Sequence, residues 1–87
     1  MAVWRSVHVG PEGDDFEVGG LEVWRHKWSS TGEPHLNLPH PSYRNQIHRF
    51  DIYEIVGTEH AVRFATGELS NGVWGFYVPG DDGQARR

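Results

Sequence analysis

The sequence predicts an all-β fold: a small antiparallel barrel, roll or sandwich of five to six strands with one long Pro/His-rich loop. Three observations support this prediction. Short segments in which apolar and polar residues alternate recur along the chain at a spacing of roughly ten residues. Glycine-rich turn sequences separate these segments. No long segment shows the apolar period of an α-helix.

The first half of the chain contains three extended segments. Residues 3–9 form the first predicted strand, which ends at the turn-forming residues 10–15. Residues 16–18 resume an extended path, and the paired glycines that follow permit a turn or a bulge. Residues 21–28 are the next predicted strand, and alternation gives it two different faces. One face carries Leu21, Val23, Arg25 and Lys27, and the other carries Glu22, Trp24, His26 and Trp28.

The two tryptophans of this strand allow two interpretations. Trp24 and Trp28 are anchors for a ligand or a partner if their face points outward. They belong to the core if the face with Arg25 and Lys27 is the solvated one. The alternation pattern favours the second interpretation, but a change of facing at the preceding glycines leaves the first one open.

The segment from Ser29 to Asn45 is predicted to be irregular. It contains Pro34, Pro39 and Pro41, and proline within a helix removes a hydrogen bond and clashes with the preceding turn. The segment is also longer than the usual connection in a small domain, and long loops often carry function. We therefore expect this loop to be the place where candidate functional residues gather.

The second half of the chain reads as two hairpins. Residues 47–56 are the longest predicted strand, and a short turn connects them to a strand over residues 60–66. Asn71-Gly72 predicts a type I′ turn that joins residues 64–69 to residues 73–78. The predicted core consists of Val7, Leu21, Val23, Phe50, Ile52, Val62, Phe64, Trp74, Phe76 and Val78. We expect one β domain over residues 1–79 and a disordered tail over residues 80–87, because the tail has almost nothing to bury.

Composition limits the classes of partner. With 8 basic and 12 acidic residues the formal net charge is −4, so an extended nucleic acid is an unlikely ligand. The absence of cysteine excludes disulfides, thiolate zinc sites and a cysteine nucleophile. No apolar run long enough for a membrane helix occurs, so no membrane partner is expected. The small size and the aromatic content of 13% favour a homodimer, and the arginine bias is typical of a bacterial, cytoplasmic protein.

Histidines in and around the proline-rich loop suggest a metal site. His35 and His40 lie five positions apart within it, and His26 and His48 lie on the flanking predicted strands. Two or three neutral imidazoles with a carboxylate, from Glu22 or Glu33, would bind zinc, copper, nickel or iron. The spacing matches no standard metal motif, and five-residue spacing in a loop imposes no common direction on the rings. The competing interpretation is that each ring has its own structural partner.

The same region suggests acid–base chemistry. Two histidines as acid and base, with Arg44 or Arg49 facing an anionic transition state, would cleave a phosphodiester. A serine triad is a weaker alternative, because the elbow motif around the nucleophile is missing.

The chain is therefore expected to be a small binding or interaction module without an assembled catalytic motif, contacting a small molecule or a protein partner. The alternative is a small enzyme that uses His35, His40 and His48, as a metal-dependent or an acid–base hydrolase. The candidate ligand-binding residues are His35, His40, Tyr43, Arg44, His48, Trp24 and Trp28.

Overall fold

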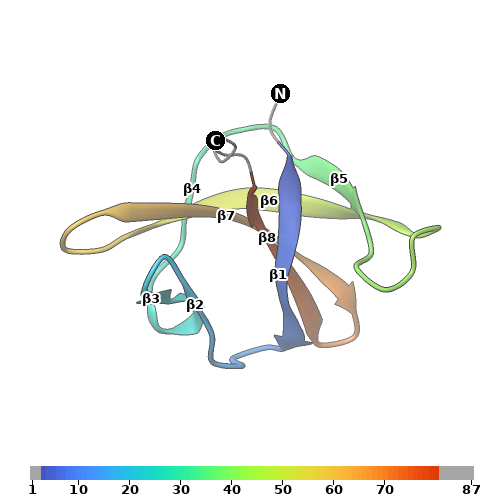
Figure 1. Cartoon of the computed structure of the whole chain (residues 1–87), viewed down its shortest axis with the longest axis horizontal. Helices are drawn as coiled ribbons and strands as arrows, with labels where there is room; N and C mark the ends of the chain where they lie inside the picture. The colour runs from blue at the N-terminus through green and yellow to red at the C-terminus, as the bar shows by residue number, and fades with distance from the viewer. Residues whose placement is uncertain (1–2, 81–87) are drawn as a thin grey trace.

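One large antiparallel sheet and one small hairpin make up the structure (Figure 1). The computed structural model describes residues 3–80. The large sheet has six strands in the order β1-β8-β7-β6-β4, and β5 also pairs with β6; β2 and β3 form the separate hairpin. The all-β, antiparallel prediction is confirmed, but the barrel is wrong, because β1 and β4 end the sheet without pairing with each other. The strands are β1 Trp4–Pro11, β2 Glu17–Val18, β3 Leu21–Glu22, β4 Ser29–Ser30, β5 Leu36–Pro39, β6 Ile47–Val56, β7 Ala61–Ser70 and β8 Val73–Pro79.

The continuous strand predicted for residues 21–28 is wrong. Only Leu21–Glu22 belong to a strand, and the chain then forms a short 3-10 helix, η1 (Val23–Arg25). The carbonyl of Val23 accepts hydrogen bonds from the backbone N–H of His26 and from the indole N–H of Trp28, the latter at 2.8 Å. In a strand, neighbouring side chains would point to opposite faces, whereas this turn brings both Val23 and Trp24 against the same core.

The predicted irregular loop over residues 29–45 is wrong in part, because it contains β4 and β5. In β5, Leu36 and Leu38 alternate toward the core while the residues between and after them are exposed. Pro39 ends this strand, a position at which a missing N–H is tolerated on a sheet edge. The three prolines hid the strand, because the alternating stretch between them is only four residues long.

The predicted long hairpins are present. β6 has the bounds that the sequence predicted, and β7 continues to Ser70. Gly72 has a φ of +79°, as predicted, but the type I′ turn is wrong, because no other residue type among residues 3–80 has a positive φ and this turn requires one at Asn71. The β7–β8 pairing instead shifts register between Glu68 and Ser70. Of the predicted tail, only Gly80 is described, and its N–H donates to the carbonyl of Val3; residues 81–87 lie outside the described residues.

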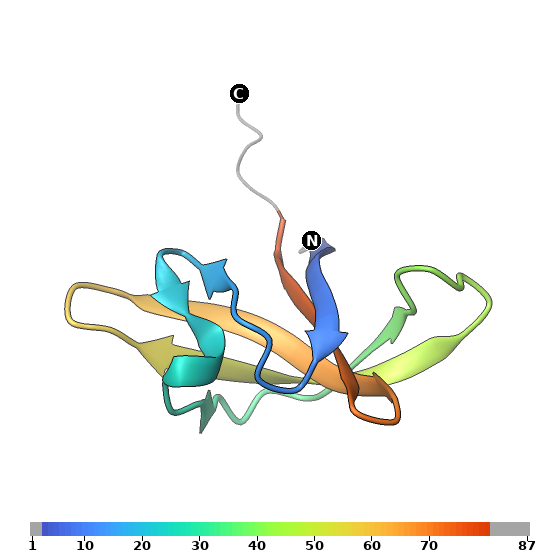
Figure 2. The same cartoon turned by 90° about the horizontal axis from the view of Figure 1, so that it is seen from below.

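The core consists of two clusters, because both faces of the central strands are covered (Figure 2). Six of the ten predicted core residues are buried, whereas Val7, Leu21, Val62 and Trp74 are only partly buried. The first core cluster contains Val23, Ile55, Phe64, Phe76 and Val78, and the second contains Phe50, Ile52, Ala65, Leu69 and Tyr77. Four of these were missed (Ile55, Ala65, Leu69 and Tyr77), since the alternation rule assigns only one face of a strand to the core. None of the described residues forms a helix long and apolar enough to cross a membrane.

Candidate functional site in the β5–β6 hairpin

The hairpin formed by β5 and β6 lies at one end of the large sheet, and the β6–β7 turn lies at the other (Figure 1). Its base is fixed by burial, since Leu36 and Leu38 pack on the second core cluster. The hydroxyl of Tyr77 on β8 donates a hydrogen bond to the carbonyl of Pro39, and burial raises the pKa of this tyrosine. The hairpin is therefore tied to the sheet at the point where its loop begins.

Hydrogen bonds within the loop fix its backbone. The N–H of His40 donates to the carbonyl of Gln46, and the N–H of Gln46 donates to the carbonyl of Tyr43, each at 2.9 Å. The imidazole of His40 accepts at Nδ1 from the backbone N–H of Ser42 at 2.9 Å and of Tyr43 at 3.3 Å. The His40 ring thus accepts from two adjacent N–H groups, while its backbone N–H donates across the turn, so this residue connects both sides of the loop.

The two hydrogen bonds accepted at Nδ1 determine which tautomer of the neutral His40 ring fits the loop. Because Nδ1 accepts two N–H groups, the neutral ring carries its proton on Nε2. A metal at Nε2 would require the proton to move to Nδ1, where it would face two donors. The two hydrogen bonds accepted at Nδ1 therefore disfavour metal binding through Nε2 of His40 in this loop conformation.

Three rings form a row on the hairpin, with His40 in the middle. The ring centroid of His40 lies 4.8 Å from that of Tyr43 and 5.5 Å from that of His48. The Nε2 of His48 donates to the side-chain oxygen of Gln46 at 3.3 Å. The structure thus brings together three of the sequence-predicted site residues.

The other predicted ligands do not join this row. His35 is exposed in the connection before β5. His26 follows η1, and its Nδ1 donates to the carbonyl of Glu22 at 2.7 Å. Within residues 3–80, no group of three or more histidine or carboxylate side chains is close enough together to hold a metal ion, and no pocket opens on the surface.

The two tryptophans singled out in the sequence face the core. Trp24 and Trp28 are partly buried against the first core cluster, with ring centroids 4.9 Å apart. The indole N–H of Trp28 is satisfied by Val23, whereas those of Trp24 and Trp74 are buried without a hydrogen-bond partner in the described part of the chain. The structure thus agrees with the second interpretation given above: the two tryptophans pack on the core, and Arg25 and Lys27 are exposed.

The loop presents large side chains to solvent. Tyr43 is 57% exposed and Ile47 is 61% exposed. Arg44 is exposed at the tip and makes no ion pair with any residue between 3 and 80. Residues 34–50 contain no aspartate or glutamate, although the chain as a whole is acidic. We refer to Tyr43, Arg44 and Ile47 together as the hairpin tip.

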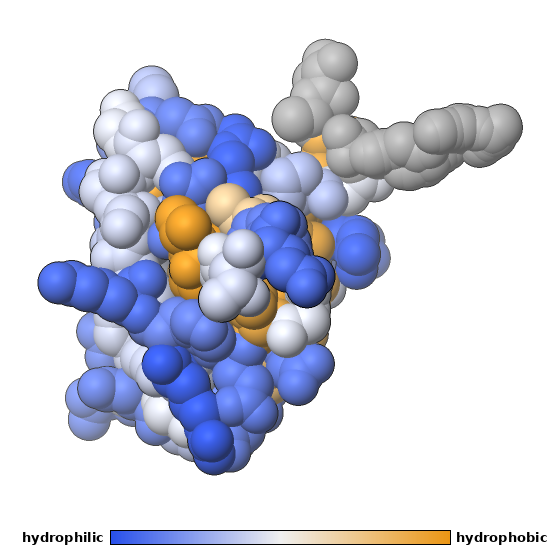
Figure 3. Space-filling model, turned by 90° about the vertical axis from the view of Figure 1, so that its left-hand side faces the viewer, coloured by the Kyte–Doolittle hydropathy of each residue, from blue (hydrophilic) through white to orange (hydrophobic). Residues whose placement is uncertain are grey.

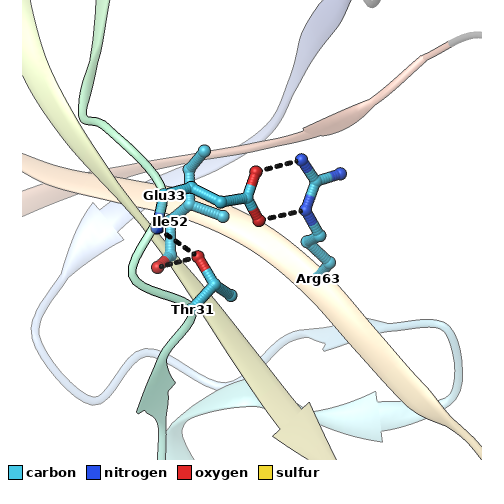
Figure 4. Close-up of polar contacts among 4 residues, drawn as sticks. All are labelled: Thr31, Glu33, Ile52 and Arg63. Carbon is cyan, nitrogen blue, oxygen red and sulfur yellow. Dashed lines mark hydrogen bonds and ion pairs between the residues drawn. The ribbon is translucent and has the colours of Figure 1, made fainter.

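An ion pair that sequence reasoning missed fixes the chain just before the hairpin (Figure 4). The guanidinium of Arg63 on β7 donates to both carboxylate oxygens of Glu33, at 2.6 and 2.9 Å. The Thr31 hydroxyl donates to the carbonyl of Ile52 on β6 and accepts from the N–H of Glu33. The Arg63 hydrogen bond lowers the pKa of Glu33, and the same bond raises the pKa of Arg63.

This pair gives Glu33 a role different from the one expected. The sequence suggested Glu33 as a metal ligand, but both of its oxygens are engaged by Arg63, which also lies over the ring of Trp4 with its Cζ 5.2 Å from the ring centroid. No feature of the sequence pairs the two residues, which are 30 positions apart. The pair connects the segment before β5 to β7.

Comparison with known proteins gives no relative: no family model, no curated protein and no solved structure matches this chain. The function must therefore be argued from the hairpin itself. The hairpin offers a hydrogen-bonded loop backbone and a row of three rings. It also presents Arg44, which has no ion pair within residues 3–80, and the exposed side chains of Tyr43 and Ile47.

Proposed function

We propose that this chain is a non-catalytic protein-interaction module and that the hairpin tip is its contact element. A single observation carries the proposal. The loop backbone is fixed by four internal hydrogen bonds, three of them involving His40, while its largest side chains remain in solvent. Burial explains ordered apolar side chains in a core, but it does not explain why Tyr43 and Ile47 are held outside.

Contact with a partner is the function that such an arrangement serves best. Ordering a loop upon binding costs free energy, about 0.5–1.5 kcal/mol for each immobilised side chain, and a loop that is already ordered avoids part of that cost. Tyrosine and arginine are also the residue types that contribute most to binding at interfaces. Tyr43 and Arg44 are adjacent and both are exposed.

Site-specific photocrosslinking tests this function. A photoreactive phenylalanine analogue replaces Tyr43 in one protein and the exposed Val9 of β1 in a control protein, and each is irradiated in extract of the source cells. We expect a discrete product from position 43 only. Excess wild-type chain should suppress that product, whereas the Tyr43→Ser/Ile47→Ser double variant should not. Identical products from both positions, or equal suppression by the double variant, would overturn the proposal.

The homodimer and the bacterial cytoplasm remain proposals as well. Support for a homodimer is the small size of the chain and its 13% aromatic content. Support for the location is the arginine bias, with a single lysine at position 27. A second copy of the chain is a partner that the interaction proposal accommodates directly.

A small hydrolase is the second candidate function. One observation favours it: His40 and His48 lie side by side, with ring centroids 5.5 Å apart, and the bonds accepted at Nδ1 make Nε2 the N–H donor of His40. Metal analysis of the purified protein, together with hydrolysis of bis(p-nitrophenyl) phosphate, separates the two functions. Stoichiometric metal, or hydrolysis that is lost in the His40→Ala variant, would favour the enzyme.

A further inference from the structure

The β2–β3 hairpin, which contacts the β6–β7 turn opposite the hairpin tip, carries several carboxylates. Residues 14–22 contain Asp14, Asp15, Glu17 and Glu22, and the exposed cations Arg25 and Lys27 follow them in the chain. Three of these carboxylates are engaged within the molecule, Asp14 by His8 and Asp15 and Glu22 by Arg25. Glu17 on β2 and Glu59 in the β6–β7 turn are exposed and make no ion pair with the described residues.

The same end carries an apolar surface. Figure 3, which views this end directly, shows an apolar patch around the β6–β7 turn with hydrophilic residues at its border. Val56 is 68% exposed at the end of β6, and Val62 on β7 is partly exposed. The β2–β3 hairpin adds Val18 and Leu21, both partly exposed and paired with each other. Val18, Leu21 and Val62 lie on the sheet face of the first core cluster, whereas Val56 lies on the opposite face at the end of β6. We call these four apolar residues, together with Glu17 and Glu59, the acidic end patch.

The patch is a fixed surface because its two parts are joined. The Nε2 of His60 donates to the carbonyl of Gly19 at 2.7 Å, which connects the β6–β7 turn to the β2–β3 turn. The backbone at Gly19 is packed so closely that a Cβ placed there would lie 2.5 Å from Cγ1 of Val62. The β2–β3 turn and the β6–β7 turn are therefore held side by side.

We infer that the hairpin tip of one copy binds the acidic end patch of a second copy. The two surfaces are complementary in charge and in polarity. Arg44 has no ion pair at one end, and Glu17 and Glu59 have none at the other. Exposed apolar side chains accompany the charges on both surfaces, so contact removes apolar area from water at the same time.

The contact must form between copies. The tip and the patch lie at opposite ends of β6, whose 10 residues span about 30 Å. Each copy offers both surfaces, so two copies in antiparallel orientation form two equivalent contacts, in keeping with the symmetry of most homodimers. This inference rests on the proposed function, because it uses the same hairpin tip.

Sedimentation velocity over a micromolar to millimolar range tests the inference, with three variants of the full chain. The tip variant is Tyr43→Ser with Arg44→Glu, the patch variant is Glu17→Arg with Glu59→Arg, and the control is Val9→Ser with Lys27→Glu. Val9 and Lys27 are exposed and belong to neither surface. Circular dichroism confirms that each variant is folded.

We expect wild type and control to form dimers that weaken in high salt, since salt screens exposed charges. The tip and patch variants should each associate at least about tenfold more weakly, a difference of about 1.4 kcal/mol. A mixture of the two variants should associate again, because it combines one intact tip with one intact patch and pairs the two reversed charges.

Two results would overturn the inference. One is a wild-type chain that stays monomeric at millimolar concentration, and the other is association that survives in the tip or the patch variant. If the tip-dependent crosslink identifies a different protein while the chain stays monomeric, the inference fails and the interaction function stands. If neither the crosslink nor the self-association depends on the hairpin tip, the proposed interaction function and this inference both fail.

Discussion

Two regions of this molecule are rich in rings, and they use them in opposite ways. In the first core cluster, Phe64 and Phe76 are completely buried, and Trp24 and Trp28 cover them from the segment between β3 and β4. In the hairpin loop, the row of rings is ordered by hydrogen bonds to the backbone; Tyr43 is exposed, while His40 and His48 are half-buried. Rings stabilise this fold where another segment covers them, and we propose that Tyr43, which no segment within residues 3–80 covers, serves contact instead.

The largest effect is expected in the buried cluster. Phe76→Ala removes a side chain with no exposed area that contacts the rings of Phe16, Trp24 and Phe64. We expect a loss of about 3–5 kcal/mol in the free energy of unfolding. Urea denaturation measures this loss. A cost below about 1 kcal/mol would mean that the rings of this cluster do not carry the stability of the fold.

A turn outside both regions should have an intermediate effect. Gly72 has a φ of +79°, and a Cβ placed there would meet no atom within 4 Å. The cost of Gly72→Val is therefore backbone strain alone, and we expect about 1–2 kcal/mol. Chemical denaturation measures it beside Asn71→Ala as a control, since Asn71 has no positive φ. Equal costs for the two variants would show that strain at Gly72 is not the cause.

The hairpin loop should respond locally. His40→Ala removes the acceptor of the Ser42 and Tyr43 N–H groups, and we expect a loss of about 1 kcal/mol in global stability. Amide hydrogen exchange at Ser42 and Tyr43 should accelerate, while the amides of β7 and β8 stay protected. The exposed His35 supplies the control, and His35→Ala should leave these rates unchanged. Unaltered exchange in His40→Ala would show that the loop is ordered by something else.

The ion pair beside the hairpin should give a small dependence on pH. Because Arg63 lowers the pKa of Glu33 in the folded chain, the stabilisation is present above the unfolded-state pKa and is lost as pH falls through the lowered value. Glu33→Gln should remove this part of the acid-side decline in melting temperature. Glu12→Gln, which removes an exposed carboxylate without an ion pair in residues 3–80, should leave it in place. Identical profiles of melting temperature against pH for the two variants would contradict the assignment of this pH dependence to the Glu33–Arg63 ion pair.

Local sequence patterns predicted most of this fold. The bounds of β6 and the positive φ of Gly72 follow from alternation and turn chemistry alone. Where tertiary contacts decide the backbone, the same rules failed. The carbonyl of Val23 bonds an indole five positions away and ends a strand that alternation would have continued to Trp28. Ile55 and Tyr77 are also buried, because both faces of the sheet are covered, whereas the alternation rule assigns only one face of each strand to the core.

The candidate site was only partly predictable. The length of the segment that contains His40 and Tyr43, and the metal-binding and acid–base chemistry of its histidines, pointed to it as the candidate site. Nothing in the spacing showed that His40 would bond the backbone while His35 and His26 lie elsewhere, since ring direction depends on the hairpin register. The pairing of Arg63 with Glu33 joins segments 30 positions apart and has no local pattern at all.

The most direct test of the difference between the two regions is the unfolding free energy of the Tyr43→Ser/Ile47→Ser double variant. It is measured by urea denaturation at a concentration where the chain is monomeric. If the hairpin tip serves contact and not stability, the value should lie within about 0.5 kcal/mol of wild type, as for other exposed positions. A loss of about 2 kcal/mol or more would show that these side chains hold the fold together, and it would contradict the assignment of the tip as a contact surface.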